Sequence, residues 1–414
     1  MKVLTYTSPA RGHLFPVVPI LDELQRRGHE IAVRTLSSQV PLLRDRGFAA
    51  GPIAPVVEAM ELDDYLARSP LGKMKRGMAK FGLRAEPEIG DLRSAIEEER
   101  PDAILVDAMS WGASAVAEAW GGPWAQWFPY PLPLSSRDVP PFGPGLKPLP
   151  GPLGRARDSA LRPLLFGAMW RATLPRLNAV RAAVGVRPLA GIDEMYTVAP
   201  LLLYMTAEPF EYHRSHWPRS IRMVGPCPWE PPADPPAWLA DIDRPLVLVS
   251  TSSEFQDDGR LVTTTLEALA DEPVEVVATI PSARVPSGAL PGNARVAPFL
   301  PHTPILARAA CAITHGGAGA TQKALAAGVP VCVVPFGRDQ LEVARRVEVA
   351  QAGTRLTAQR LTADRLRDKV RQAMMRTPGA RRVAEGFAAA GGPVTAAEAF
   401  EAHATMPAAP SGVR

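Results

Sequence analysis

The chain has 414 residues, which is too long for one ordinary domain and suits two domains of roughly 200 residues each. Hydrophobic residues make up 46% of it and charged residues 21%, a composition that excludes an intrinsically disordered protein. The net charge of +4 is spread along the sequence, so we expect no nucleic-acid partner.

The apolar segments and the cysteines narrow the class of protein further. No apolar run approaches the roughly 18 residues that a membrane span needs, so we expect no stable membrane insertion. Cys227, Cys311 and Cys332 lie far apart, which argues against a disulfide framework and against a zinc site. We therefore expect a cytoplasmic protein that binds no metal.

The N-terminal segment predicts a strand, a helix and a second strand. Residues 3–7 form an apolar strand and residues 8–15 a loop, and Pro16 suits the first turn of the helix that follows. One face of this helix carries apolar residues at helical spacing: Val17, Ile20, Leu21 and Leu24. The next strand begins at residues 31–33. This crossover predicts a parallel sheet.

The pattern recurs further along the first half of the chain. Residues 104–106 predict a strand and residues 112–120 a helix. Nine prolines in residues 129–152 predict a long loop, and a helical region follows over about 155–184. Six prolines in residues 226–236 stiffen the chain and exclude a helix, so we place the domain boundary there.

The second half restarts the alternation of strands and helices. Strands are predicted at 246–249, 274–280, 312–314 and 331–334, with helices at 261–269, 321–327 and, in the Ala-rich tail, 380–403. The architecture is therefore α/β, with two doubly wound, Rossmann-like domains. Because such sheets bind ligands beyond the carboxyl ends of their strands, we expect the site in a central cleft between the domains.

A glycine-rich turn joins a strand to a helix at residues 315–321, His-Gly-Gly-Ala-Gly-Ala-Thr. Glycines let the backbone approach a ligand closely, and a helix N-terminus presents free N–H groups to a diphosphate. His315 could donate to a phosphate oxygen. The turn could equally be a tight βα connection without a ligand, and it matches neither the dinucleotide GxGxxG nor the P-loop motif.

Residues on both sides of this turn favour a nucleotide-sugar ligand. The ring of Phe299 lies upstream and can stack on a base, whereas Asp339 and Gln340 follow a strand downstream and can bind sugar hydroxyls. Base, diphosphate and sugar binders thus occur in the order that a nucleotide-sugar requires.

Two residues of the first half are candidates for acid–base chemistry. His13 follows the first strand and Asp107 follows the strand at 104–106, so both lie at the carboxyl edge of one sheet. A neutral imidazole can take the proton of an acceptor hydroxyl, and a carboxylate can fix its tautomer. Each residue also has a structural interpretation, because a loop histidine or an aspartate commonly caps a helix.

Together these segments resemble the donor-binding signature of the UDP-glycosyltransferase superfamily, which has the GT-B fold, and in particular its bacterial macrolide-type and natural-product members. The segment Gly12-His13-Leu14-Phe15-Pro16 and Asp107 match as well, so the resemblance extends over most of the chain. It implies an acceptor-binding domain at 1–225, a linker at 226–240, a nucleotide-sugar domain at 241–380 and a tail at 381–414 that packs back on the first domain.

The resemblance also implies roles for individual residues. His13 would be the general base and Asp107 its partner in a single inverting displacement. The implied donor-binding residues are Ser252, Ser253, Phe299, Leu300, His315, Gly317, Ala318, Gly319, Ala320, Asp339 and Gln340. The main departure is Lys323, which stands where the family usually has a glutamate that binds the ribose. A lysine cannot accept hydrogen bonds from the ribose hydroxyls.

The implied activity is that of a metal-independent hexosyltransferase. It would move a sugar from a UDP- or TDP-sugar to a hydroxyl of a hydrophobic acceptor such as a polyketide, macrolide, phenolic or glycolipid, with no other cofactor. Candidate residues for the acceptor wall, each of which could also be plain core, are Trp111, Phe128, Phe142, Met169 and Trp170. Two alternatives remain: a non-catalytic nucleotide-sugar-binding partner protein, or a nucleotide-sugar epimerase on the same fold.

Overall fold

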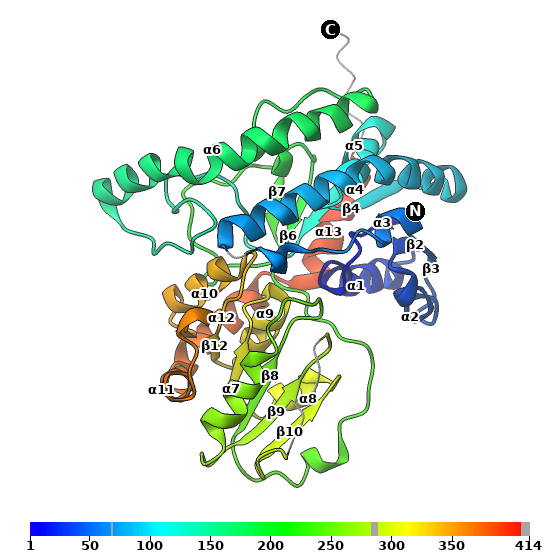
Figure 1. Ribbon diagram of the computed structural model, residues 1–414. Coiled ribbons are helices and arrows are strands. Elements are labelled where there is room, and N and C mark those ends of the chain that lie inside the picture. Colours follow the sequence, from blue (N-terminus) through cyan, green and yellow to red (C-terminus); the bar gives the residue numbers. More distant parts are fainter. Residues whose placement is uncertain (68, 283–288, 407–414) are drawn as a thin grey trace.

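The computed structural model describes residues 1–67, 69–282 and 289–406. Two lobes, each built on one parallel sheet, lie one above the other in Figure 1. The first sheet draws its strands from residues 2–223 and the second from residues 246–355. The α/β class and the two parallel-sheet domains predicted from the sequence are therefore confirmed.

The first sheet has seven strands in the order β3-β2-β1-β4-β5-β6-β7, and every neighbouring pair is parallel. Its strands are β1 (Lys2–Tyr6), β2 (Glu30–Thr35), β3 (Ala49–Pro52), β4 (Ala103–Asp107), β5 (Trp124–Phe128), β6 (Leu202–Tyr204) and β7 (Ile221–Met223). The α-helices of this lobe are α1 (Arg11–Arg26), α2 (Val40–Arg44), α3 (Pro55–Glu58), α4 (Pro70–Glu99), α5 (Trp111–Trp120) and α6 (Gly151–Ala183). Its 3₁₀ turns are η1 (Ser37–Gln39), η2 (Asp64–Leu66) and η3 (Ile192–Tyr196).

The second sheet has six parallel strands in the order β10-β9-β8-β11-β12-β13. Its strands are β8 (Leu246–Ser250), β9 (Glu275–Thr279), β10 (Ala294–Ala297), β11 (Ala309–Thr314), β12 (Val331–Val333) and β13 (Gly353–Arg355). The 3₁₀ turn η4 (Ala237–Leu239) precedes this sheet. The helical elements in and after it are α7 (Arg260–Leu269), α8 (His302–Leu306), α9 (Ala318–Ala326), α10 (Gln340–Val349), η5 (Ala358–Arg360), α11 (Ala363–Met374), α12 (Thr377–Ala389) and α13 (Gly392–Ala404).

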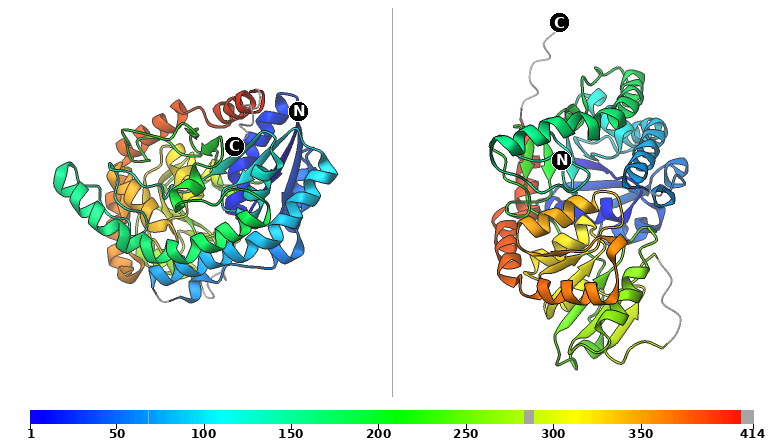
Figure 2. Two further views of the ribbon diagram at one scale, coloured as in Figure 1. Left: turned by 90° about the horizontal axis from the view of Figure 1, so that it is seen from above. Right: turned by 60° about the vertical axis from the view of Figure 1, so that its left-hand side comes forward.

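The central strands are apolar because helices cover both faces of each sheet, as the two views in Figure 2 show. All five residues of β4 and of β8 are buried. In each sheet the first and fourth strands along the chain are paired side by side, β1 with β4 and β8 with β11. Successive strands are added outward from one side of each pair and then from the other, so each pair is the topological switch point of its sheet. Ligands of such sheets bind beyond the carboxyl ends of the strands at this point.

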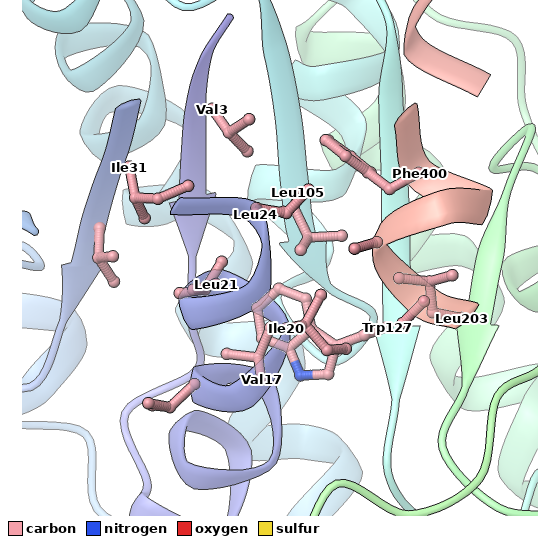
Figure 3. Packing of buried hydrophobic residues seen from close by; sticks show 14 of the residues in the cluster. Val3, Val17, Ile20, Leu21, Leu24, Ile31, Leu105, Trp127, Leu203 and Phe400 are labelled. Carbon is pink, nitrogen blue, oxygen red and sulfur yellow. The ribbon is translucent and has the colours of Figure 1, made fainter. Parts of the chain in front are cut away.

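The last two helices lie on different lobes. Helix α12 packs beside α9 in the second lobe, with Val383 and Phe387 buried in the core of that lobe. Helix α13 crosses back and packs against α1, where Phe400 is fully buried. Figure 3 shows Phe400 in the same apolar cluster as Leu105, Trp127 and Leu203 of the first sheet. The C-terminal segment thus joins the two lobes a second time.

One predicted boundary is wrong. Residues 8–15 were expected to form a loop, but α1 begins at Arg11, so His13 lies in the first turn of a helix. The amides of His13 and Leu14 both donate to the carbonyl of Ala10, and these bonds start the helix before Pro16. Pro16 therefore lies inside α1, as does Pro19, and neither residue can donate a backbone N–H to the helix.

Candidate active site

An imidazole and a carboxylate meet at the carboxyl edge of the first sheet. His13 comes from the first turn of α1 and Asp107 is the last residue of β4. The His13 Nδ1 atom lies 2.6 Å from Asp107 Oδ2, and both residues are buried, with 7% and 0% of their surface exposed. A carboxylate accepts only, so Nδ1 carries the proton and Nε2 is the basic ring nitrogen.

The main chain fixes the carboxylate of Asp107. Its Oδ2 accepts a further hydrogen bond from the amide of Ser8, and its Oδ1 accepts from the amide of Met109. The indole of Trp127 donates to the carbonyl of His13. The ring of Tyr130 packs edge-on against the imidazole, with 5.0 Å between ring centroids. The orientation of the imidazole is therefore set by contacts on several sides.

A cavity of about 420 Å³ lies between the two lobes and is bordered by His13. Apolar side chains dominate the part that the first lobe contributes. They include Phe15, Met74, Met78, Phe81, Met109, Phe128, Tyr130, Phe142, Trp170 and Tyr196. This end of the cavity can bury a hydrophobic molecule beside the basic nitrogen of His13.

The candidate acceptor residues separate into three groups. Phe128, Phe142 and Trp170 line the cavity. Trp111 does not: it is 2% exposed and packs behind Phe81 with 6.1 Å between ring centroids, so its assignment to the wall is wrong. The side chain of Met169 lies outside the part of the chain that the structure describes.

The glycine-rich turn borders the opposite end of the cavity. Gly316 has a φ of +93° and Gly317 is the N-cap of α9, so Ala318, Gly319 and Ala320 form the first turn of that helix. Their amides cannot bond within the helix, and all four residues from Gly317 to Ala320 line the cavity. A Cβ at Gly317 would stand 2.4 Å from His315 Nε2, so the ring lies directly on this backbone.

His315 is buried and tied to the strand beside it. Its Nδ1 atom lies 3.3 Å from the carbonyl of Ser250, which makes Nδ1 the donor and leaves Nε2 without a proton in the neutral ring. Burial lowers the pKa of His315, an effect that the Asp258 carboxylate opposes. Nε2 can therefore donate to an anion only after it gains a proton, which the anion's own charge would favour.

The other residues predicted to bind the donor also border the cavity. Ser252, Ser253, Phe299 and Leu300 line it, and the ring of Phe299 is 50% exposed. The hydroxyl of Ser252 already accepts hydrogen bonds from Gln256 Nε2 and the amide of Glu254. Phe299 therefore offers a free ring face, whereas the hydroxyl of Ser252 shapes its own loop.

Asp339 and Gln340 line the cavity but differ in what they can offer a ligand. The Gln340 side chain accepts from the amides of Phe336 and Gly337 and donates to Gln256 Oε1, so it is used to fix the loop. In contrast, Asp339 Oδ2 is buried and has no hydrogen-bond partner among the residues that the structure describes. Burial raises the pKa of Asp339 to about 6. Its orphaned oxygen can accept a hydrogen bond from a hydroxyl in the cavity.

Two contacts across the cleft hold the lobes together near the site. The guanidinium of Arg338 donates two hydrogen bonds to Asp64 of η2, at 2.9 and 3.0 Å. Lys73 Nζ donates to the carbonyl of Phe336. Since Arg338 precedes Asp339, this contact ties the loop that carries the orphaned carboxylate to the acceptor side of the cavity.

The sequence analysis missed one functional candidate, Glu230. It lies in the proline-rich segment, which was interpreted only as a linker, and it lines the cavity beside Lys323. Lys323 Nζ donates to Glu230 Oε2 at 3.0 Å and to the carbonyl of Trp229 at 2.9 Å. No pattern in the sequence pairs these positions, because the contact joins residues 93 apart.

The described residues contain neither a cluster of metal-ligating side chains nor a membrane-spanning helix. Over residues 1–67, 69–282 and 289–406, no group of three or more histidine, cysteine or acidic side chains is placed to hold a metal ion. No helix within the same residues has the length and apolar character needed to cross a membrane.

Comparisons with known proteins agree on a class. A family model described as "Erythromycin biosynthesis protein CIII-like, C-terminal domain" matches residues 263–402. The 4'-demethylrebeccamycin synthase of Lentzea aerocolonigenes is 31% identical over 388 residues, which span 89% of this chain and 91% of that protein. The chain therefore belongs to the bacterial natural-product glycosyltransferases of the UDP-glycosyltransferase superfamily.

Solved structures confirm the GT-B fold. The glycotransferase of kitacinnamycin aligns with a TM-score of 0.74 at 24% identity, over 97% of this chain and 98% of its own. Glycosyltransferase VinC, solved in complex with dTDP, aligns with a TM-score of 0.69 at 22% identity, over 98% of this chain and 99% of its own. Together with the relative that is 31% identical over most of the chain, this makes the protein an enzyme, a glycosyltransferase, as the sequence predicts.

Proposed function

We propose that this glycosyltransferase moves a sugar from a UDP- or TDP-sugar to a hydroxyl of a hydrophobic acceptor, with inversion at the anomeric carbon. The observation that carries the proposal is the pairing of His13 with Asp107 at 2.6 Å on the wall of a cavity whose opposite end is the N-terminus of α9. One end can activate a hydroxyl, and the other can hold a diphosphate.

The chemical step is a single displacement. The acceptor oxygen forms a bond to the anomeric carbon as its proton passes to His13 Nε2, and the bond from that carbon to the diphosphate oxygen breaks. Attack from the face opposite the leaving group inverts the centre. Asp107 remains ionised and stabilises the imidazolium through Nδ1–H. The proton is later released from the imidazolium to solvent.

The second lobe would stabilise the leaving diphosphate. The free amides at the start of α9 and its positive helix end face the cavity at Gly317 to Ala320. A proton gained by His315 Nε2 would add a charged donor at the same place. These groups supply the positive charge that the leaving group requires, so the proposed reaction uses no metal and no cofactor besides the donor.

The polarity of the cavity supports a hydrophobic acceptor. Met78, Phe81, Phe128 and Trp170 lie on the same side as His13. The dTDP complex of VinC, a structural neighbour, supports a nucleoside diphosphate at the other end.

A transfer assay with a panel of UDP- and TDP-sugars and aromatic or polyketide acceptors tests this function. His13→Ala should bind UDP or TDP as the wild type does while its turnover falls on the order of 10³-fold, within the range of general-base catalysis. Unchanged turnover would reject His13 as the base. Interconversion of donor sugars without an acceptor would instead identify an epimerase.

A further inference from the structure

The carboxylate of Glu230 is held by donors from two segments of the second lobe. Its Oε1 atom accepts from the amide of Thr303 at 2.9 Å, and its Oε2 atom accepts from the amide of His302 at 2.8 Å. Oε2 also accepts from Lys323 Nζ at 3.0 Å. Only 17% of the Glu230 side chain and 15% of the Lys323 side chain are exposed.

These bonds place Glu230 between the two ends of a bound nucleotide. His302 follows Phe299 closely in the chain, and Phe299 offers its half-exposed ring to the cavity. Lys323 lies on α9, whose N-terminus at Gly317 faces the cavity. A nucleoside diphosphate whose base stacks on that ring and whose phosphates meet α9 must put its pentose between them, beside Glu230.

Glu230 is ionised in this setting. Burial raises its pKa, but the Lys323 ammonium and the hydrogen bonds from Thr303 and His302 outweigh burial and lower the pKa to about 2. An ionised carboxylate only accepts hydrogen bonds, and pentose hydroxyls can donate them.

Building on the proposed function, we infer that Glu230 accepts a hydrogen bond from one pentose hydroxyl of the donor nucleotide and that Lys323 positions it. A carboxylate has about four acceptor positions. Thr303 uses one on Oε1, while His302 and Lys323 use both on Oε2. One position therefore remains, on Oε1, and the side chain of the exposed Thr303, which also bonds this carboxylate, is the group that a pentose hydroxyl would replace there. The Glu230 carboxylate can therefore accept a hydrogen bond from one pentose hydroxyl, whereas a carboxylate with no other partners could accept from two.

Calorimetric titration of the full chain with UDP, 2′-deoxy-UDP and 3′-deoxy-UDP tests this count. One of the two deoxy analogues should bind about tenfold more weakly than UDP, as expected for one hydrogen bond to a charged group. The other should bind within about twofold of UDP, because the hydroxyl that it lacks makes no hydrogen bond to Glu230 in the UDP complex. Inorganic pyrophosphate, which has no pentose, is the matched ligand control.

Two variants separate the roles of the pair. Glu230→Gln should bind UDP and both deoxy analogues with the same affinity, since it removes the charged acceptor, and should bind pyrophosphate as the wild type does. Lys323→Met frees a position on Oε2, so both deoxy analogues should now bind more weakly than UDP. This second variant keeps the proposal testable if Glu230→Gln fails to fold.

The outcomes that overturn the inference are distinct. It fails if the wild type binds UDP and both analogues equally, if both analogues bind weakly, or if the difference persists in Glu230→Gln. A wild-type chain that binds neither UDP, TDP nor pyrophosphate would refute the proposed function itself.

Discussion

Arg338 and Asp64 form a two-bonded ion pair that crosses the cleft of this glycosyltransferase. Asp64 belongs to the acceptor lobe and is 3% exposed, and Arg338 stands next to Asp339 on the wall of the cavity. Nearby, the rings of Tyr65 and Phe255 meet edge to face with 5.0 Å between centroids. These contacts close the lobes over the place where the donor sugar would lie.

Asp64→Asn should loosen this closure. Water would then reach the donor, so the ratio of transfer to donor hydrolysis should fall about tenfold, which corresponds to ~1.4 kcal/mol. Product analysis with and without acceptor measures this ratio. Asp63→Asn is the matched control, because Asp63 pairs with Arg76 and Lys80 within its own lobe. Equal ratios in the two variants would exclude a role for the pair in closure.

Asp107→Asn should retain the fold and the affinity for UDP but lose turnover. The neutral amide that replaces the carboxylate cannot stabilise a proton on His13 Nδ1 by charge. Nε2, which faces the acceptor, is then no longer fixed as the basic ring nitrogen. We expect kcat to fall on the order of 10²–10⁴-fold. Steady-state kinetics beside UDP titration distinguishes this loss from a loss of binding; a weaker Kd with normal kcat would contradict the assignment.

Gly317→Ala should weaken diphosphate binding. Its Cβ would stand 2.4 Å from His315 Nε2, so the imidazole must leave the backbone that it covers. We expect the Kd for UDP to rise about tenfold, the equivalent of ~1.4 kcal/mol. Gly292→Ala is the control, because no atom of the residues that the structure describes lies within 4 Å of a Cβ there. If both variants bind UDP like the wild type, the turn does not hold the phosphates.

Glu88→Gln should stabilise the protein at alkaline pH. Glu88 is fully buried, and its Oε2 accepts from the amide of Gly112. Burial raises its pKa to about 8, although Gly112 and Arg84 oppose the effect. The folded state therefore holds a proton that the unfolded state releases above its ordinary pKa, so stability falls as pH rises from about 4.5 to 8.

Melting temperatures at pH 5 and pH 9 check this sign. The stabilisation by Glu88→Gln should be larger at pH 9 than at pH 5. The difference should be about 1.4 kcal/mol for each pKa unit by which folding raises the pKa of Glu88. Glu86→Gln, an exposed change on the same helix, should show no such dependence. A gain that is equal at both pH values would mean that Glu88 is ionised in the folded protein.

Much of the fold could be predicted because strands and helices each leave a local signature. The apolar runs at 246–249 and 331–334 and the helical spacing from Val17 to Leu24 correspond to elements of the structure. The start of α1 could not be predicted, because Gly12 and His13 are weak helix formers and Pro16 suggested a later start.

The site was predicted where its residues sit at strand ends and in the glycine-rich turn. Side-chain contacts between distant segments have no local sequence pattern, so they could not be predicted. Nothing local distinguishes Trp111, which is buried behind Phe81, from Trp170, which lines the cavity. The use of the Gln340 amide within its own loop, and the pairing of Glu230 with Lys323, likewise depend on the folded arrangement of the two lobes.

Helix α13 has a consequence for how the molecule assembles. Ala396, Ala397 and Phe400 complete the apolar core around α1 and the first sheet, although the second sheet lies between them and β7 in the chain. During synthesis, the acceptor lobe must therefore wait with one flank open until the ribosome has passed residue 400, long after its own strands have emerged. A chaperone that shields nascent apolar surface would find its longest-lived target on that flank, where α1 waits for α13.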